Sequence, residues 1–423
     1  MAAENQLRAL TRAAETALAE GRIREAKGLI AQARSADPNN PDMLAACAIL
    51  TLRAGEASEA KTLIDAAIAR DPRNPRHLVN LAMVLRELKD PEGELHALTS
   101  ALALDPYFFT ANLQKASLYE LQGKKKQAAG AYHAALSSLR PGLPIATQLR
   151  PILEHAQQVV QANYNELEQW LRERMRDVRQ QYGTAAQDRV DDCLAAFLGK
   201  KRIYNAQPTM THFPRLPAIP FFERTDFEWL ADVEAATADI RGELERLLEA
   251  SLHDFSPYVS HAPGVPLLQW TELNNSPRWS ALFLYKDGER VQANLERCPR
   301  TVAALARAPQ VQIPNRGPTA FFSRLEPNTR IPPHTGSTNT RLTVHVPLIV
   351  PPGCGFRVGS EVREWQPGTA LIFDDTIEHE AWNDSGEPRV ILIFDIWNPL
   401  LTPAERDLMT VATSGIAEFF AAE

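Results

Sequence analysis

The sequence lacks several features that would assign a protein to a definite class. Its four cysteines, Cys47, Cys193, Cys298 and Cys354, lie far apart and form no CxxC pair, which argues against a disulfide framework. No stretch approaches the roughly 18 apolar residues of a membrane span, and the N-terminus lacks the basic segment and apolar run of a secretory signal. The formal net charge of -7 argues against a surface for nucleic acid or anionic lipid. We therefore expect a cytoplasmic protein with no membrane span and no nucleic-acid partner.

The length and the proline distribution predict more than one domain. A chain of 423 residues is too long for one ordinary core. Of the 31 prolines, 22 follow residue 200, which is typical of a passage from a helical region to a strand-rich one with many turns. We predict an α+β multidomain chain with an all-α solenoid at residues 1–140, a helical cap or connector at 141–205 and a strand-rich domain at 206–423.

The first 140 residues repeat with a period of 34. Asp37-Pro38, Asp71-Pro72 and Asp105-Pro106 follow this spacing. Two series of alanines do so as well, namely Ala14, Ala48, Ala82 and Ala116, and Ala33, Ala67, Ala101 and Ala135. Small residues at fixed phases predict two helices per repeat that cross closely. The pattern resembles four tetratricopeptide repeats over about residues 5–140.

Two phases of the repeat carry an exception. Gly21, Gly55 and Gly123 share one phase, in which the third repeat carries Lys89. Glu94 stands where other repeats have alanine. A generic helical bundle with accidental periodicity is the competing interpretation. As a solenoid, the array would present a concave surface to a peptide or protein partner, or else serve in packing or dimerisation.

The segment after the array has the pattern of a terminal helix. Pro141-Gly142-Leu143-Pro144 breaks the array, and Leu153, Val160 and Leu167 then recur every seven residues on one helical face. Such a helix would cover the last apolar face of a solenoid. Further helices are predicted over 185–199 and over 226–251, the latter ending near Ser251.

Short runs of β-forming residues follow, separated by turn residues. They are predicted at 279–285, 320–323, 342–349, 370–373 and 390–396. Strands at this spacing favour a sandwich or barrel such as a jelly roll.

Two histidines, His334 and His379, lie at the ends of β-like segments. Neutral imidazole is a good ligand for iron or copper, and histidines on neighbouring strands can reach one metal. The usual non-haem iron triad has a carboxylate two residues after its first histidine, where this chain has Gly336. Taken singly, either histidine could instead be a hydrogen-bonded structural residue.

A longer pattern surrounds these histidines. Besides Ser323 it comprises His334-Thr335-Gly336-Ser337-Thr338-Asn339, Arg341-Leu342-Thr343-Val344-His345, Leu371-Ile372-Phe373-Asp374-Asp375, Glu378-His379-Glu380-Ala381-Trp382, Arg389, and Phe394-Asp395-Ile396-Trp397-Asn398-Pro399. In order and context it resembles the aspartyl/asparaginyl β-hydroxylase family, loosely over 210–400 and tightly over 320–400. The resemblance implies a double-stranded β-helix, a jelly-roll or cupin-like fold, that uses Fe(2+), 2-oxoglutarate and O2. Glycine in place of the triad carboxylate is a feature of that family.

The resemblance also implies roles for individual residues. His334 and His379 would be the iron ligands, and Arg389 would bind the distal carboxylate of 2-oxoglutarate as a bidentate guanidinium. The remaining candidates for cosubstrate binding are Ser323, His345, Arg341 and Trp279. For Arg389 and His345 the alternative is ordinary pairing on a strand surface.

Three positions leave the site open to interpretation. Relatives can carry a 2-oxoglutarate-binding arginine where this chain has Thr343, so that Arg341, water or another group would complete the pocket. Asp374 and Asp375 are candidates for an acid beyond the metal ligands, or for caps of the turn after a strand.

These observations predict a dioxygenase that hydroxylates an aspartyl or asparaginyl side chain of a peptide or protein recruited by the repeats. One alternative keeps this chemistry but acts on a small molecule or lipid head group. Another is a repeat scaffold whose β domain has lost activity and only binds.

Overall fold

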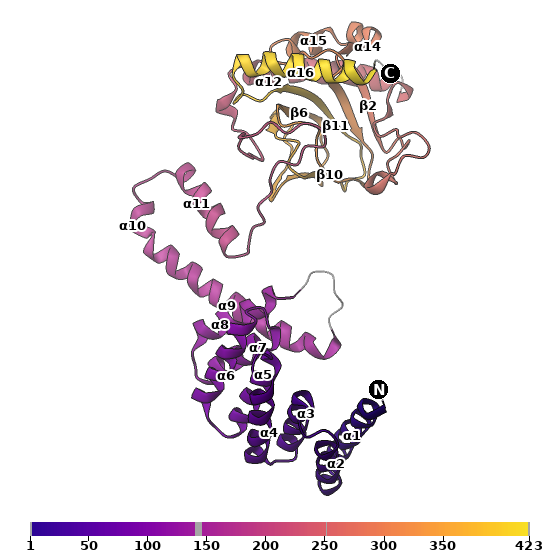
Figure 1. The fold of residues 1–423 in the computed structure, drawn as a ribbon. Helices are drawn as coiled ribbons and strands as arrows, with labels where there is room; N and C mark the ends of the chain where they lie inside the picture. Colours follow the sequence, from indigo (N-terminus) through magenta and orange to yellow (C-terminus); the bar gives the residue numbers. More distant parts are fainter. Residues whose placement is uncertain (1, 140–145, 251, 422–423) are drawn as a thin grey trace. The chain divides into compact units, whose positions relative to one another are not determined.

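The computed structural model describes residues 2–139, 146–250 and 252–421. The chain divides into two compact units, residues 1–188 and 189–423 (Figure 1). The border falls within segment 141–205, for which a connector is predicted. Residues 141–144, where the array should break, and Ser251, where a helix should end, lie outside the described residues. None of the helices in the described part of the chain is long and apolar enough to cross a membrane.

The first unit is built from consecutive helical pairs. These are α1 (Ala2–Ala19) with α2 (Ile23–Ala36), α3 (Pro41–Arg53) with α4 (Ala57–Arg70), α5 (Pro75–Glu87) with α6 (Pro91–Leu104), and α7 (Phe109–Leu121) with α8 (Lys125–Ser137). The alanines of both periodic series are buried. A larger side chain at these positions would separate the crossing helices. The expected repeat array is therefore confirmed over the described residues.

The exceptions in the repeat pattern have structural reasons. Gly21, Gly55 and Gly123 adopt positive φ in the turn between paired helices, and Lys89 adopts φ 59° at the same place. Their shared phase is thus a backbone requirement, which glycine meets with least strain. Glu94 is buried but accepts two hydrogen bonds from Arg86, at 2.6 and 2.8 Å, so its charge is paired.

A long helix, α9 (Arg150–Arg174), packs its first half on the last repeat. Leu153 and Ala156 of this helix are buried, and Val160 packs against the cluster formed by Ala116 and Tyr132. This part of α9 therefore contacts the last repeat. The helix continues into the short α10 (Arg176–Arg179), and α11 (Thr184–Phe197) contains the border between the units.

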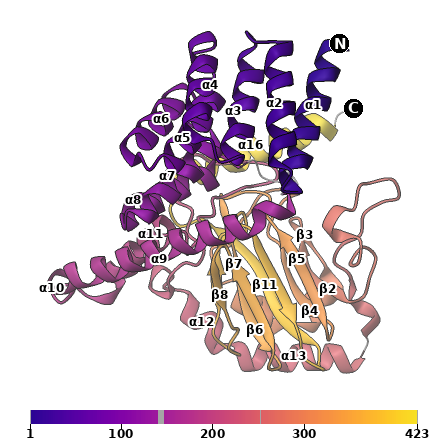
Figure 2. The same ribbon diagram turned by 90° about the horizontal axis from the view of Figure 1, so that it is seen from below.

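The second unit contains two antiparallel sheets (Figure 2). The larger has the order β1-β2-β4-β11-β6-β9, with β3 also paired to β2, and the smaller has the order β5-β10-β7-β8. Their strands are β1 (Ser256–Pro257), β2 (Trp279–Lys286), β3 (Glu289–Arg290), β4 (Ala320–Leu325), β5 (Thr329–His334), β6 (Arg341–Ile349), β7 (Cys354–Val358), β8 (Glu361–Arg363), β9 (Leu371–Phe373), β10 (His379–Asn383) and β11 (Arg389–Trp397). The strand-rich domain predicted from the turn spacing is therefore present.

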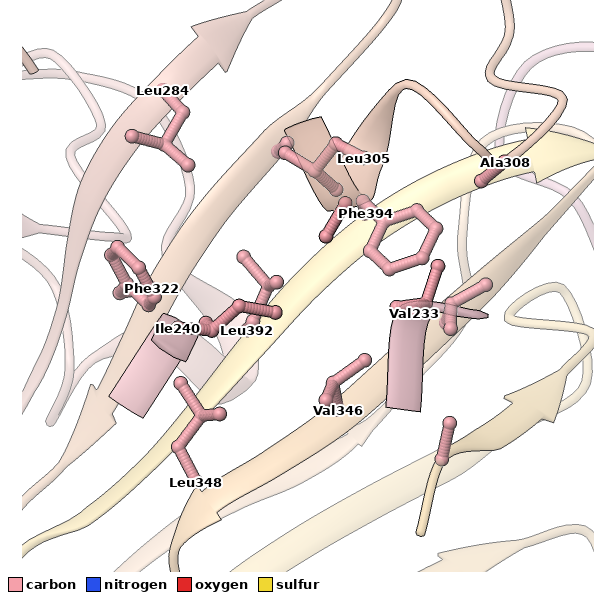
Figure 3. Packing of buried hydrophobic residues seen from close by; sticks show 14 of the residues in the cluster. Val233, Ile240, Leu284, Leu305, Ala308, Phe322, Val346, Leu348, Leu392 and Phe394 are labelled. Atoms are coloured by element: carbon pink, nitrogen blue, oxygen red, sulfur yellow. The ribbon is translucent and has the colours of Figure 1, made fainter. Parts of the chain in front are cut away.

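Helices cover one face of the larger sheet. They are α12 (Leu230–Ala235), α13 (Thr237–Ala250), α14 (Gln292–Arg297) and α15 (Pro299–Leu305), and α16 (Pro403–Ala421) follows the last strand. The helix expected over 226–251 is thus divided into α12 and α13. Each buries its own apolar residues in one core, where Val233 and Ile240 meet Phe322, Val346 and Leu392 of the sheet (Figure 3).

Alternation along the strands determines which residues reach the other face. In β4, β6 and β11 the even-numbered side chains, such as Phe322, Val344 and Leu392, pack against the helices. Because successive side chains of a strand point to opposite faces, the odd-numbered ones face the smaller sheet. This places Ser323, His345 and Arg389 between the two sheets.

Candidate active site

A cavity of about 520 Å³ lies in the second unit, between its sheets. It brings together every site residue expected from the sequence. These are Trp279, Ser323, His334, Arg341, His345, His379 and Arg389. Trp270, Trp365 and Tyr258 also line the cavity and were not expected. No periodic or spacing signal marks them, because they come from loops or from outside the matched motifs.

His334 and His379 are direct partners across the antiparallel pair β5–β10. Their ring centroids lie 4.1 Å apart. Nδ1 of His334 is 2.8 Å from the carbonyl oxygen of Pro332, and Nδ1 of His379 is 3.0 Å from that of Ile377. Since a carbonyl oxygen only accepts, each Nδ1 carries the proton and each Nε2 keeps its lone pair. The pair therefore has the tautomer that a metal ligand needs.

Both histidines are uncharged at neutral pH. Burial, followed by the neighbouring His379, lowers the pKa of His334 to about 3. Burial lowers the pKa of His379 to about 4, although hydrogen bonds to the backbone oppose the shift. Neutral imidazole is the form that binds metal. Within the described ranges, no group of three or more His, Cys, Asp or Glu side chains is arranged to hold a metal, so two imidazoles remain as the candidate protein ligands.

Arg389 is a buried cation with an exposed fraction of only 1%. Its Nε and Nη2 have no hydrogen-bond partner in the described part of the chain, and no ion pair with a carboxylate is found there. Burial lowers its pKa to about 10, so the group is still charged at pH 7. An unpaired buried charge is costly, and such a site favours an anion.

The hydroxyl of Ser323 lies diagonally from Arg389 on the same face, since Ser323 is opposite Ile391 in the β4–β11 pair. Trp279 donates its Nε1–H to Oγ of Ser323 over 3.1 Å. Because this bond uses an acceptor position of the oxygen, the hydroxyl proton of Ser323 is free to donate into the cavity. Trp279 therefore acts on the site through Ser323.

His345 and Arg341 differ in whether their side-chain nitrogens have hydrogen-bond partners. Nδ1 of His345 has no partner among the described residues, and burial, then Arg389, lowers the pKa of this imidazole well below its ordinary value. Arg341 donates to Asp395 at 3.0 Å and to Ser337 at 2.9 Å. Burial lowers the pKa of Arg341, but the carboxylates of Asp395 and Asp375 outweigh this and raise it overall. Arg341 thus lines the cavity as a paired cation.

The two adjacent aspartates have different roles. Oδ1 of Asp374 accepts from the backbone N–H of Thr376 at 2.9 Å and from its hydroxyl, so Asp374 caps the turn. Asp375 instead lines the cavity, as Thr343 does. Burial raises the pKa of Asp375, while Arg341 and His334 lower it. Thr343 and Asp375 thus line the same cavity as the two histidines.

Comparison with known proteins gives a family for this domain. Residues 234–399 match the model of the aspartyl/asparaginyl beta-hydroxylase family, and residues 17–83 match that of the tetratricopeptide repeat. The family match spans the site residues from Trp279 to Arg389.

Two curated relatives align with the same region. The ornithine lipid ester-linked acyl 2-hydroxylase of Rhizobium tropici is 34% identical over 197 residues, which cover 45% of this chain and 65% of that protein. The aspartyl/asparaginyl beta-hydroxylase of Homo sapiens is 34% identical over 179 residues, covering 42% of this chain and 24% of that protein. The chain thus spans less than two thirds of the length of either relative.

Among solved structures, the tetratricopeptide-repeat protein TTC0263 of Thermus thermophilus has 23% identity and covers 42% of this chain and 96% of its own. Its TM-score of 0.31 is too low to support any conclusion about this chain. The chain thus contains, at residues 234–399, a region similar to the aspartyl/asparaginyl beta-hydroxylase family, joined to a region similar to tetratricopeptide repeats.

Proposed function

We propose that this chain is an iron(II)- and 2-oxoglutarate-dependent dioxygenase that hydroxylates an aspartyl or asparaginyl side chain of a peptide or protein. The observation that carries the proposal is Arg389, a buried guanidinium without an anionic partner among the described residues, in one cavity with two neutral histidines. The antiparallel sheets around them fit a double-stranded β-helix.

The free donors of the cavity fit a dicarboxylate. Two N–H groups of Arg389 match the two oxygens of a carboxylate, and the free hydroxyl proton of Ser323 adds a third donor. His345 stands on β6, where it is opposite Ile393 of β11. It would contact the end of the cosubstrate nearer the metal.

The two imidazoles of the cavity fit iron(II) as metal ligands. Nε2 of His334 and of His379 would hold the metal, with positions left for the cosubstrate and for solvent. When bound, iron supplies the oxidation in which O2 and 2-oxoglutarate give succinate and CO2, with one oxygen atom entering a C–H bond of the substrate.

The protein's own contribution is to position and to shield these groups. Trp270 lies edge-on to His334 with ring centroids 5.0 Å apart, and Phe373 lies edge-on to His379 at 5.4 Å. These rings restrict the rotation of the imidazoles and keep water away from the pair. Asp375 would orient a water molecule beside the histidines.

The substrate class rests on the family and on the repeats. Tetratricopeptide arrays bind peptides on a concave surface, so the first unit would recruit a protein substrate. The alternative substrate is a lipid, since the R. tropici relative is named as an ornithine lipid hydroxylase. The same cosubstrate chemistry applies to both.

Release of succinate tests the proposal. The full chain, purified without oxygen and loaded with iron(II), is given 2-oxoglutarate and O2 with either a panel of Asp- and Asn-containing peptides or ornithine lipid vesicles. We expect succinate in equal amount to a hydroxylated peptide residue, with His379→Ala as the inactive control. If succinate release is coupled to hydroxylation of the lipid and not of any peptide, the substrate is a lipid. Absence of both iron binding and 2-oxoglutarate turnover would falsify the enzyme assignment.

A further inference from the structure

Trp365 is a buried residue of the cavity that the proposed function does not yet use. It follows β8 and has an exposed fraction of 4%. Its indole lines the same cavity as Arg389 and His345. Nε1 of Trp365 is buried, and no hydrogen-bond partner for it is found among the described residues.

The indole ring is held in one orientation by its neighbours. It stacks on Phe356 with ring centroids 5.2 Å apart and an interplanar angle of 15°. The guanidinium carbon of Arg389 lies 4.8 Å from the centroid of the indole, at cation–π distance. His345 lies 5.9 Å from it on a tilted plane. Because the ring is fixed, its Nε1–H cannot turn away to find another acceptor.

The second indole of this site makes a useful comparison. Nε1 of Trp279 donates to Ser323 at 3.1 Å, which is the usual state of a buried indole. Trp365 differs, because its buried Nε1–H has no acceptor among the described residues. A buried donor without an acceptor is destabilising. Nε and Nη2 of Arg389, which can only donate, also lack a partner among the described residues and belong to the same cavity. A group of donors that lacks an acceptor favours an anionic ligand with several oxygens.

We propose that Trp365 is a further cosubstrate-binding residue, whose Nε1–H donates to the carboxylate that Arg389 binds and whose ring holds that guanidinium in place. This inference rests on the proposed function, because it takes 2-oxoglutarate as the ligand. It assigns two roles to one side chain. The N–H contributes affinity, and the face of the ring orients Arg389.

Two substitutions separate these roles. Trp365→Phe keeps an aromatic face for Arg389 and removes the N–H, whereas Trp365→Leu removes both. The affinity for 2-oxoglutarate is measured by titration calorimetry on the full chain with Mn2+ in place of iron, which avoids turnover. We expect Trp365→Phe to weaken binding about tenfold, equivalent to about 1.4 kcal/mol, and Trp365→Leu to weaken it further.

Trp397→Phe is the matched control. This buried tryptophan belongs to a separate cluster with Val311, Ile313 and Leu401, so its substitution should leave the affinity unchanged. Thermal unfolding of the ligand-free proteins provides a second readout. If Trp365 had only a packing role, its substitution would lower the unfolding temperature in proportion to the loss of affinity. If Trp365 acts as a donor to the ligand, removing its unsatisfied N–H should lower the unfolding temperature of the ligand-free protein little.

The outcomes distinguish this inference from the function on which it rests. If the unmodified protein binds no 2-oxoglutarate with Mn2+, the proposed function fails, and this inference fails with it. If the unmodified protein binds and Trp365→Phe binds equally well, only the donor role of Trp365 is wrong. Should Trp365→Phe not fold, Trp365→Leu tests the same donor, and unchanged affinity in it overturns the whole inference.

Discussion

A Cβ atom at position 336 would fall on the carboxylate of Asp375, far inside van der Waals contact. The two residues are also joined through the backbone, since the N–H of Gly336 donates to the carbonyl oxygen of Asp375 at 2.6 Å. Asp375 therefore occupies the space in which a carboxylate at position 336 would begin. Any side chain at position 336 would therefore displace Asp375, which glycine avoids.

The contact between Gly336 and Asp375 predicts a strong coupling in stability. Gly336→Ala should lower the free energy of unfolding by about 1–3 kcal/mol, because the added methyl overpacks the site. In an Asp375→Ala background the same change should cost little, giving a coupling energy of about 1 kcal/mol or more. Denaturant unfolding of the four proteins measures it. Additive effects of the two changes would contradict the prediction, and Gly386→Ala, where a Cβ meets nothing, is the control.

Replacing Arg389 should separate stability from binding. Arg389→Met removes an unpaired buried cation, so we expect the ligand-free protein to gain about 1–4 kcal/mol while it loses 2-oxoglutarate binding. Denaturant unfolding and calorimetry measure the two effects. Arg357→Met is the control, because Arg357 is paired with Glu378 and Glu380 and its loss should bring no gain. Lower stability in Arg389→Met would mean that an unrecognised partner neutralises Arg389.

His379→Ala should abolish metal binding without unfolding either unit. One remaining imidazole is a weak site, so affinity for Mn2+ should fall about 100-fold or more, and turnover with it. Circular dichroism should show an unchanged helical signal, because the repeats form a separate compact unit. His253→Ala, at an exposed position, is the matched control. Full activity in His379→Ala would remove this histidine from the metal site.

Asp374 should make stability depend on pH in an unusual direction. Burial, opposed by hydrogen bonds from Thr376, raises the pKa of Asp374 to about 6. Between pH 4 and 6 the folded state therefore holds a proton that the unfolded state has released, so this group makes the free energy of unfolding fall as pH rises. The decrease is of the order of 2–3 kcal/mol.

Asp374→Asn tests this pH dependence. The amide oxygen can still accept from Thr376, but the side chain no longer titrates. The difference in unfolding free energy between the two proteins should therefore change between pH 4 and 6 in favour of the variant at the higher pH. A constant difference across this range would show that Asp374 titrates normally in the fold.

Much of the architecture could be read from local pattern. The phases of Ala48 and Ala67 predicted closely crossing helices because each repeat applies the same steric limit, and both alanines are buried. The strand expected at 390–396 is present as β11, and the period of two along it puts Arg389 and Leu392 on opposite faces. The ends of helices were less predictable. The segment 226–251 contains the two helices α12 and α13, because packing against the core, and not local pattern alone, sets where a helix ends.

The sequence also pointed to His334, His379 and Arg389 as candidate site residues, because the pattern around them resembles a known family, and the structure places all three at one cavity. It could not show that Trp365 lies on Arg389, that Trp279 donates to Ser323, or that Asp375 fills the space beside Gly336. Each of these contacts joins segments separated by tens of residues, from 24 between Trp365 and Arg389 to 44 between Trp279 and Ser323. Periodicity assigns a residue to a face of its own strand, whereas only strand pairing and sheet packing decide which other residue it meets there.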